Sequence, residues 1–393
     1  MRRGPARGRL FFCCARRLPA RRYFLLPMKA PALLALACLT AASALAQTPA
    51  TSPADSAAAE PLTFYGFADG YYGYELTGQC PTRPGFIYAH HRANEFALNN
   101  AVLGLRYDDG RVRGAVALHA GTYVEANYAA EPAALRHLYE AYAGFRPFRR
   151  AWLDVGIFPS HIGFESALSK DNWTLTRSLM AENSPYYESG ARLTYEAGQR
   201  LTLTGLLLNG WQNIRDTNRA KALGTQLQWK PTAKLLLNSS TFYGNEQPQD
   251  SARRRRYFHN FYLSYAATER LSLAGIFDVG WQEQAARGRR PDNWHSAAAL
   301  LRYQLTDKWA ACTRYEYYRA DHGVIIRSIS PAPTDANFRV GGASLNLDYA
   351  PTAHVLVRLE GRALRSQDRL FTADAGRPTR TYGNLTSSIA LSF

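Results

Sequence analysis

The chain has 393 residues, a formal net charge of +16 at pH 7, 46% hydrophobic residues and 12% aromatic ones. The first 46 residues hold nine basic and no acidic residues, so the charge of the remaining 347 residues falls to +7. These residues contain no basic stripe interleaved with aromatic side chains, which argues against nucleic-acid binding, and no ligand spacing that predicts a metal or another cofactor.

The N-terminal segment predicts export. Residues 1–27 contain eight arginines and no acid. We interpret them as an upstream misreading of the start codon, with a very long basic leader as the alternative. A basic residue and an apolar run then precede Ala44-Leu45-Ala46, the arrangement of a secretory signal peptide and its cleavage site. We therefore expect a leader over residues 1–46, with the signal peptide at 28–46.

The mature chain reads as a short lead-in followed by strands. Residues 47–61 are rich in Ala, Ser, Pro and Thr without periodicity, and we expect a disordered periplasmic segment there. No later apolar run is long enough for a transmembrane helix. Apolar and polar residues instead alternate with period two in stretches of about ten residues, the length of a tilted strand that crosses a bilayer. Residues 62–393 therefore predict an all-β, transmembrane antiparallel β-barrel.

About sixteen strands are expected, and an even number places both termini on one side of the membrane. They lie at roughly 62–75, 95–107, 111–123, 135–146, 150–158, 185–196, 200–211, 220–230, 233–245, 255–267, 270–283, 292–305, 308–320, 336–350, 352–366 and 379–393. Short and long connections alternate, as in barrels with short periplasmic turns and long external loops. Five short turns share one design, in which an aromatic residue is followed six residues later by a large apolar one: Tyr195–Leu201, Trp229–Leu235, Tyr265–Leu271, Tyr303–Trp309 and Tyr349–Val355. Aromatic rings at strand ends are typical of a membrane–water interface.

The alternation also assigns the two faces of each strand. In residues 270–283, Leu271 and Phe277 point one way and Asp278 the other. A charged side chain that faces lipid costs roughly 2–4 kcal/mol near the midplane, so the charged face is the inner one. A soluble barrel with an apolar interior is the alternative, but sixteen strands enclose more volume than side chains fill. The expected charges of the pore wall are Asp278, Arg314, Glu316, Arg358, Glu360 and Arg362.

The longest connection, residues 159–184, carries charges of both signs. We expect it to fold into the lumen and narrow the passage, because fixed charges in a constriction set size and ion preference. Its segment from Ala167 to Met180 has the character of short helical turns. The expected constriction residues are His161, Glu165, Lys170, Asp171, Arg177 and Glu182. For His161 and Glu165, a purely structural role as loop anchors is an equal alternative.

The C-terminal run resembles an assembly signal. From Leu385 onward one face is apolar and ends on the terminal Phe393, while the other face is small and polar. This pattern suits a strand with lipid on one side and water on the other. It resembles the C-terminal signal by which outer-membrane barrels are recognised for insertion.

Several motifs resemble one porin family. They are the strings Asp154–Glu165, Asp171–Leu179 and Ala181–Gly190, together with Arg92–Asn99 and Asn209–Gln212. These strings are similar to the OmpL-like β-barrel porins, common in Bacteroidetes. The resemblance implies an outer-membrane porin of a Gram-negative bacterium, and it identifies neither catalytic residues nor a solute.

We therefore expect a passive, water-filled channel for small polar solutes and no enzymatic activity. Two alternatives stay open: an outer-membrane barrel enzyme of the lipase or protease type, and a structural or adhesive barrel with a closed lumen. The expected partners are outer-membrane lipid and lipopolysaccharide, the barrel-assembly machinery and small polar solutes. A homotrimer is left open.

Overall fold

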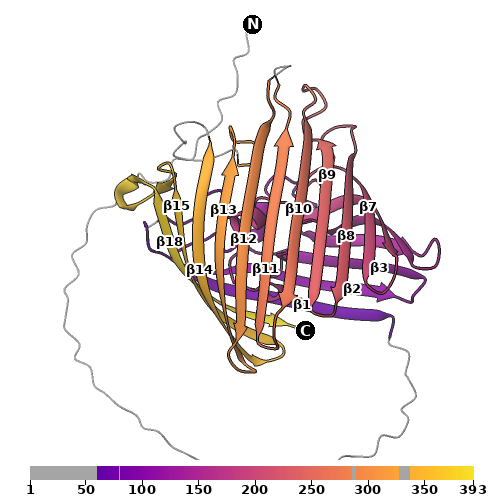
Figure 1. Cartoon of the computed structure of the whole chain (residues 1–393), viewed down its shortest axis with the longest axis horizontal. Coiled ribbons are helices and arrows are strands. Elements are labelled where there is room, and N and C mark those ends of the chain that lie inside the picture. The colour runs from indigo at the N-terminus through magenta and orange to yellow at the C-terminus, as the bar shows by residue number, and fades with distance from the viewer. Residues whose placement is uncertain (1–59, 79, 286–288, 327–336) are drawn as a thin grey trace, which may run out of the picture. The chain divides into compact units, whose positions relative to one another are not determined.

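Sixteen antiparallel strands close into a barrel within residues 61–393 (Figure 1). The structure is a computed structural model that describes residues 60–78, 80–285, 289–326 and 337–393. The predicted leader at 1–46, and the lead-in up to residue 59, lie outside the described residues. Among the described residues, no helix is long and apolar enough to span a membrane.

The barrel strands confirm the predicted architecture. They are β1 (Leu62–Glu75), β2 (Phe96–Asp108), β3 (Val112–Ala120), β4 (Leu138–Phe145), β5 (Ala151–Pro159), β6 (Tyr187–Glu196), β7 (Leu201–Leu208), β8 (Ala222–Thr232), β9 (Leu235–Asn245), β10 (Arg255–Ala266), β11 (Leu271–Gln282), β12 (Asp292–Gln304), β13 (Trp309–Ala320), β14 (Phe338–Thr352), β15 (Val355–Ser366) and β18 (Thr381–Ser392). Each strand pairs with its neighbours in the chain, and β1 pairs with β18 to close the ring. The connection before β18 holds a small sheet of β16 (Phe371–Thr372) and β17 (Pro378–Thr379) and the 3-10 turn η2 (Asp374–Gly376).

One predicted strand ends earlier than expected. The pattern suggested a strand over 111–123, but β3 stops at Ala120 and the helix α1 (Thr122–Asn127) follows. Gly121 separates them with φ 138°, and a Cβ at this position would lie 2.3 Å from the carbonyl oxygen of Asn99. The chain leaves the sheet at this close backbone approach. The alternation of apolar and polar residues does not predict where that happens.

The two faces of the wall differ as a membrane barrel requires. On the outer face large apolar side chains are exposed, including Leu345, at 62% exposed, and Ile389, at 59%. Consecutive residues of β11 show the alternation: Phe277 points outward and Asp278 is buried on the inner face. Because water is absent from the hydrocarbon region, closure of the sheet also satisfies the backbone groups that an open edge would expose.

Strand length varies around the ring. The strands β3, β4, β5 and β7 have 9, 8, 9 and 8 residues. The strands β10 to β15 have 12 to 15 residues and form the tall wall in Figure 1. Crossing a bilayer takes about 9–11 residues, so the strands of the tall wall are longer than this length, and β4 and β7 fall just short of it.

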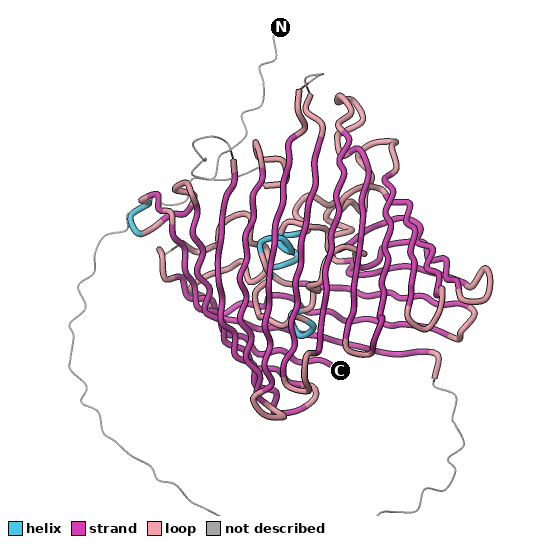
Figure 2. Tube along the Cα trace, in the orientation of Figure 1, coloured by secondary structure: helices cyan, strands magenta, loops and turns pink. Residues whose placement is uncertain are grey.

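The connection between β5 and β6 turns into the barrel. We call residues 160–186 the crossing loop. It contains the 3-10 turn η1 (Ser169–Asp171) and the short helix α2 (Leu179–Glu182), where the hydroxyl of Ser178 accepts a hydrogen bond from the amide of Ala181. Figure 2 draws short helices within the ring of strands, and hydrogen bonds described below join the loop to walls far from β5.

A large cluster of apolar side chains packs inside the barrel. Phe86 and Ile87 from the β1–β2 connection pack with Leu179 of the crossing loop in one buried cluster that includes wall residues of β7 to β15. The rings of Phe86 and Phe338 lie 5.0 Å apart. This packed region contrasts with the water-filled interior that the sequence analysis predicts.

Candidate functional site

One end of the crossing loop is anchored by His161. Its Nδ1 donates to the carboxylate of Glu188 at 2.9 Å, and its Nε2 donates to the carbonyl oxygen of Thr241 at 2.8 Å. Its own carbonyl accepts bonds from Gln226 and Ser240, each 2.8 Å long. Burial alone would lower the pKa of His161, but the Glu188 carboxylate reverses this and raises the pKa above its usual value. Because both ring nitrogens face acceptors, the charged imidazolium fits the site.

The middle of the loop is held by Arg314 of β13. Its guanidinium donates to the hydroxyl of Thr174 at 2.7 Å and to the carbonyl oxygen of Thr176 at 2.5 Å. It also donates to Glu360 of β15 at 3.1 Å, and the same carboxylate accepts the amide of Thr176 at 2.5 Å. The loop backbone therefore completes a buried ion pair between two strands.

A second arginine, two strands along the ring, repeats this arrangement. Arg358 of β15 donates to the carbonyl oxygens of Ser169 and Asn172 at 2.7 and 3.0 Å. Its Nε donates to Asp348 of β14 at 2.7 Å. Guanidinium groups suit this position because their fixed fork of donors reaches a carboxylate and two carbonyls at once.

The helix α2 is held at its N-terminus by another wall pair. The amide of Leu179 donates to Glu316 at 2.6 Å, and Arg362 donates to the same carboxylate at 2.9 Å. Within the loop, Glu165 accepts the amide of Ser178 at 3.1 Å and lies 3.6 Å from Arg314. Burial raises the pKa of Glu165, and the nearby Arg314 only partly opposes this effect.

The remaining loop charges contact other connections. Arg177 lies between the rings of Tyr123 and Tyr186, 4.2 and 4.1 Å from their centroids. Glu182 accepts the amide of Tyr88 in the β1–β2 connection at 2.9 Å. The crossing loop is therefore bonded to two neighbouring connections as well as to the wall.

Most of the residues predicted to line the passage are buried. The six predicted wall charges are at most 7% exposed, and His161, Glu165, Arg177 and Glu182 are at most 8% exposed. Asp278 accepts a bond from Asn260 at 2.6 Å instead of facing water. Only Lys170 and Asp171 of the predicted set keep substantial contact with solvent, with side chains 34% and 44% exposed.

The solvent-facing side of the loop meets a different part of the wall. A cavity of about 420 Å³ is lined there by Lys170, Asp171, Tyr65, Arg106, Tyr139 and His354, among others. A second cavity of about 210 Å³ shares Tyr139 and lies against Ser160–Ala167. Arg106 donates to Glu140 at 2.9 Å with half of its side chain in solvent.

Two further arginines on this side share one carboxylate. Arg113 of β3 and Arg192 of β6 donate to Asp154 of β5 at 2.6 and 2.9 Å. Gly144 on the intervening strand makes room, because a Cβ there would lie 2.2 Å from the Asp154 carboxylate. Our sequence analysis did not single out Arg106, Arg113, Glu140 or Arg192. These residues occupy inward-facing positions of alternating strands, and that pattern could have identified them.

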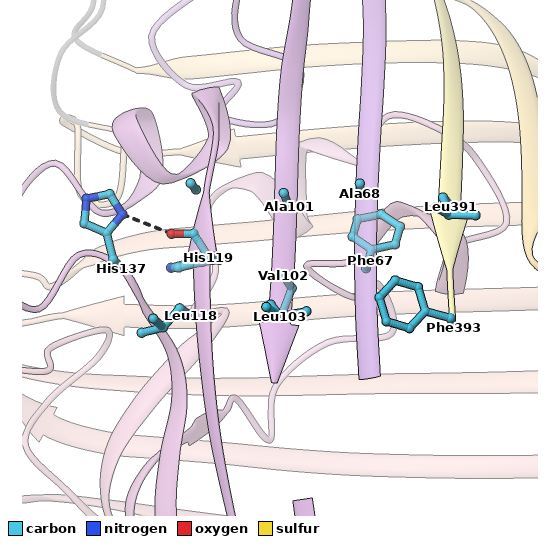
Figure 3. Close-up of a pocket in the computed structure, with 11 residues that line it drawn as sticks. Phe67, Ala68, Ala101, Val102, Leu103, Leu118, His119, His137, Leu391 and Phe393 are labelled. Carbon is cyan, nitrogen blue, oxygen red and sulfur yellow. Dashed lines mark hydrogen bonds between the residues drawn. The ribbon is translucent and has the colours of Figure 1, made fainter. Parts of the chain in front are cut away.

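The terminal residue lies on the outer face beside β1. The amide of Phe393 donates to Gly66 at 3.1 Å, and the amide of Gly66 donates back at 3.0 Å. Figure 3 shows Phe393 and Leu391 near Ala68 and Ala101, at a shallow apolar groove of about 510 Å³. A Cβ on Gly66 would lie 2.3 Å from the Phe393 ring, so a glycine is needed beneath it.

These features define a class: a closed sixteen-stranded barrel with an apolar outer face and a charged loop across its interior is a membrane barrel of the porin type. The profile of the family described as "Putative beta-barrel porin-2, OmpL-like" matches residues 61–393, and the chain belongs to this family. It is accordingly an outer-membrane porin, as the motif resemblance predicted.

Comparisons of the fold agree with this assignment. The channel DcaP of Acinetobacter baumannii matches with a TM-score of 0.57 and 12% identity over 84% of this chain and 97% of that one. OmpT of Vibrio cholerae matches with a TM-score of 0.56 and 10% identity over 84% and 97%. An anion-selective porin from Comamonas acidovorans matches with a TM-score of 0.56 and 8% identity over 84% and 99%. At these identities the likeness establishes the fold alone. No curated protein matches the sequence.

Proposed function

We propose that small polar solutes diffuse through this porin along the solvent-facing side of the crossing loop, and that the loop is the constriction. The observation that carries the proposal is the asymmetry of the loop. One side is hydrogen-bonded to β13, β14 and β15, and the other borders cavities with partly exposed charges. Fixed charges beside a narrow aqueous passage act strongly on ions, because the surrounding dielectric is low.

The proposed constriction residues revise the predicted set. Lys170 and Asp171 remain, joined by Arg106 and Glu140 from the facing wall and by His354 from the turn between β14 and β15. Apart from Asp278, which is bonded to Asn260, the other predicted loop and wall charges act as anchors that hold the loop in place. This is the structural alternative considered for His161 and Glu165.

Single-channel recording tests the proposal. The purified protein in planar bilayers should give ohmic conductance, and sugars of increasing size should reduce it up to a cut-off. Replacing residues 165–180 by a short Gly/Ser linker should raise conductance and weaken ion selectivity. Unchanged conductance in that variant would place the constriction elsewhere.

A structural barrel with a closed lumen is a second candidate, and the apolar packing around Phe86 and Phe338 favours it. The same recordings decide between the two: a closed barrel gives no conductance in wild type and opens only when the loop is shortened.

We also propose that the protein is not an enzyme. In the described ranges, the only hydrogen bond between a serine hydroxyl and a histidine ring joins Ser239 and His259, on the outer face. A hydrolase assay with lipid and peptide substrates checks this point.

We further propose that the mature chain begins near Gln47 and that Phe393 is read by the barrel-assembly machinery. N-terminal sequencing of outer-membrane fractions tests the first point. Deleting Phe393 should leave chains in the periplasm for degradation, whereas normal surface levels would refute the second. The variant Gly66→Val displaces the Phe393 ring but keeps it. This variant should therefore assemble better than the protein that lacks Phe393.

A homotrimer through the short wall of β3 to β7 is the proposed assembly. One structure of the V. cholerae OmpT, with a TM-score of 0.55 and 10% identity, is described as a trimer form. Short strands expose a narrow apolar band, which suits burial against other copies. Cross-linking in intact membranes should give a trimer. Lipopolysaccharide is the proposed lipid partner of the remaining surface.

A further inference from the structure

One buried cation of the crossing loop, Arg177, has no counter-charge in contact with it. The residue is 2% exposed, and within the described part of the chain its guanidinium forms no ion pair. Its Nη2 donates to the carbonyl oxygen of Ala167 at 2.9 Å, whereas its Nη1 is buried and has no hydrogen-bond partner. The rings of Tyr123 and Tyr186 cover the guanidinium, but aromatic rings attract a cation without neutralising it. Because a buried charge is stable only when it is paired, the surroundings of Arg177 favour an additional anion.

The other buried charges of the crossing loop are bonded to different groups. Glu182 accepts the backbone amide of Tyr88 at 2.9 Å, and Glu165 accepts that of Ser178 at 3.1 Å. Neither carboxylate forms an ion pair with Arg177. The charge of Arg177 is therefore left to a group from outside the chain.

The cavity of about 210 Å³ lies beside this guanidinium. Two of the residues that line the cavity contact Arg177: Ala167 accepts its hydrogen bond, and the ring centroid of Tyr186 lies 4.1 Å from it. Tyr186 is 8% exposed, and its hydroxyl is buried without a hydrogen-bond partner. Arg177 and Tyr186 thus provide one uncommitted N–H and one uncommitted O–H at the same cavity.

The backbone of the crossing loop adds further donors to the wall of this cavity. Phe164, Glu165 and Ala167 line it, and none of their amides donates a hydrogen bond to any described residue. Gly163 precedes them with φ 97°, and a Cβ at this position would meet nothing within 4 Å, so the backbone borders open space there. Successive backbone N–H groups in a turn form concave sites that bind anions. The donors of the cavity therefore outnumber its free acceptors.

We propose that this cavity is a binding site for a small carboxylate anion. One carboxylate oxygen accepts a hydrogen bond from Nη1 of Arg177, and the other accepts one from the Tyr186 hydroxyl. Such charge-assisted bonds are strong where burial lowers the dielectric. A single negative charge matches the single free cation. Since a water molecule occupies about 30 Å³ in the liquid, the cavity has room for roughly seven waters, or for an acid of two or three carbons with a few waters.

A bound carboxylate would join three separate parts of the crossing loop. The cavity is lined by residues 160–167 at the start of the loop and by Tyr186 at its end, and Arg177 comes from the middle. The anion enters from the larger cavity of about 420 Å³, with which this cavity shares Tyr139. Occupancy therefore stabilises the folded position of the loop, since a ligand that binds only the folded state raises its stability. This inference does not rest on conduction through the lumen.

Binding of acetate to the folded, full-length mature protein in detergent tests the site. Saturation-transfer NMR at constant ionic strength measures the affinity, with acetamide as the uncharged ligand of the same shape and chloride as a competing anion. The test variants are Arg177→Gln, which removes the charge, and Tyr186→Phe, which keeps the ring and removes the free hydroxyl. The matched control is Tyr318→Phe, because the Tyr318 hydroxyl on β13 is also buried without a partner but does not line this cavity. Heat-modifiable migration establishes folding.

We expect Arg177→Gln to bind acetate at least about tenfold more weakly than wild type, since it loses a charge-assisted bond. Tyr186→Phe should bind about fivefold more weakly through the loss of one hydrogen bond, and Tyr318→Phe should bind as wild type does. Acetamide should bind wild type at least about tenfold more weakly than acetate.

The proposal is overturned if wild type binds no acetate, if acetamide binds as tightly as acetate, or if Tyr318→Phe loses as much affinity as Tyr186→Phe. Displacement of acetate by chloride at equal concentration would overturn the assignment to carboxylates. If Arg177→Gln does not fold, Tyr186→Phe and the acetamide comparison decide. Because binding is measured in detergent and not by conductance, failure of this site and failure of the proposed channel are observed separately.

Discussion

The two sides of the crossing loop use the same residue types for different purposes. Toward β13 and β15, Arg314 and Glu360 are completely buried and bonded to loop backbone. Toward β2 and β4, Lys170 and Arg106 stay in partial contact with solvent. Burial, and not the presence of charge, therefore separates residues that hold the loop from residues that a permeating ion can meet.

The energetic consequence is a difference in how each side tolerates substitution. A buried ion pair that loses one partner leaves an uncompensated charge, at a cost of about 3–5 kcal/mol. An exposed pair contributes about 0–1 kcal/mol and is screened by salt. Substitutions on the buried side should therefore change stability first, and those on the solvent side should change selectivity first.

The largest effect is expected for Arg314→Met. This change removes the cation that faces Glu360, Glu316 and Glu165, and it frees the loop at Thr174 and Thr176. The free energy of unfolding should fall by about 3–5 kcal/mol, and the channel should become noisy. Denaturation followed by tryptophan fluorescence, together with bilayer recordings, measures both effects.

The matched control is Lys170→Met, which removes an exposed cation of the same loop. The free energy of unfolding of this variant should change by about 0–1 kcal/mol. If the two variants lose equal stability, burial does not distinguish the two sides of the loop.

The comparison extends through the wall to neighbouring residues of β11. Phe277→Arg places a charge in lipid and should cost roughly 2–4 kcal/mol if it lies near the midplane, with Phe277→Leu as the control. If Asp278 lined the pore wall, as the alternation predicts, Asp278→Arg would be tolerated and would alter ion selectivity. The structure changes this expectation because Asp278 is buried against Asn260, so Asp278→Asn should fold and Asp278→Arg should not. Refolding yields into lipid vesicles test all four variants.

The contrast between the two sides of the crossing loop shows which features can be predicted from the sequence and which cannot. Strand number, facing and the inward-turning connection follow from local patterns, namely period-two alternation and the length of residues 159–184. Arg314 and Arg106 have the same local pattern, since each is an inward arginine in an alternating strand. Their different burial depends on where a loop more than a hundred residues from Arg314 is held, and no local pattern carries that information.

A smaller effect, on selectivity without loss of stability, is expected on the solvent side. Lys170→Gln should make the channel more selective for cations, and Asp171→Asn should make it more selective for anions. Each substitution removes a fixed charge beside the cavity of about 420 Å³. Both shifts should shrink at high salt through screening. Reversal potentials in a salt gradient measure them. The control neutralises a buried pair through Arg358→Gln and Asp348→Asn. A larger selectivity shift in this control than in the Lys170 and Asp171 variants would contradict our assignment of the passage to the solvent side.

The smallest effect is a pH dependence of the loop anchor at His161. Its pKa is raised in the folded protein, mainly because the Glu188 carboxylate outweighs the effect of burial. The stabilisation is therefore complete below the ordinary histidine pKa of about 6.5 and is lost as pH rises through the raised value. Above that value the neutral ring can donate to only one of its two acceptors, Glu188 or Thr241, and the loop should become more mobile. Open-channel noise should therefore rise reversibly with pH, while His161→Gln should show higher noise with no such dependence. If the variant keeps the wild-type pH profile, another group is responsible and His161 is not the pH-sensitive anchor of the crossing loop.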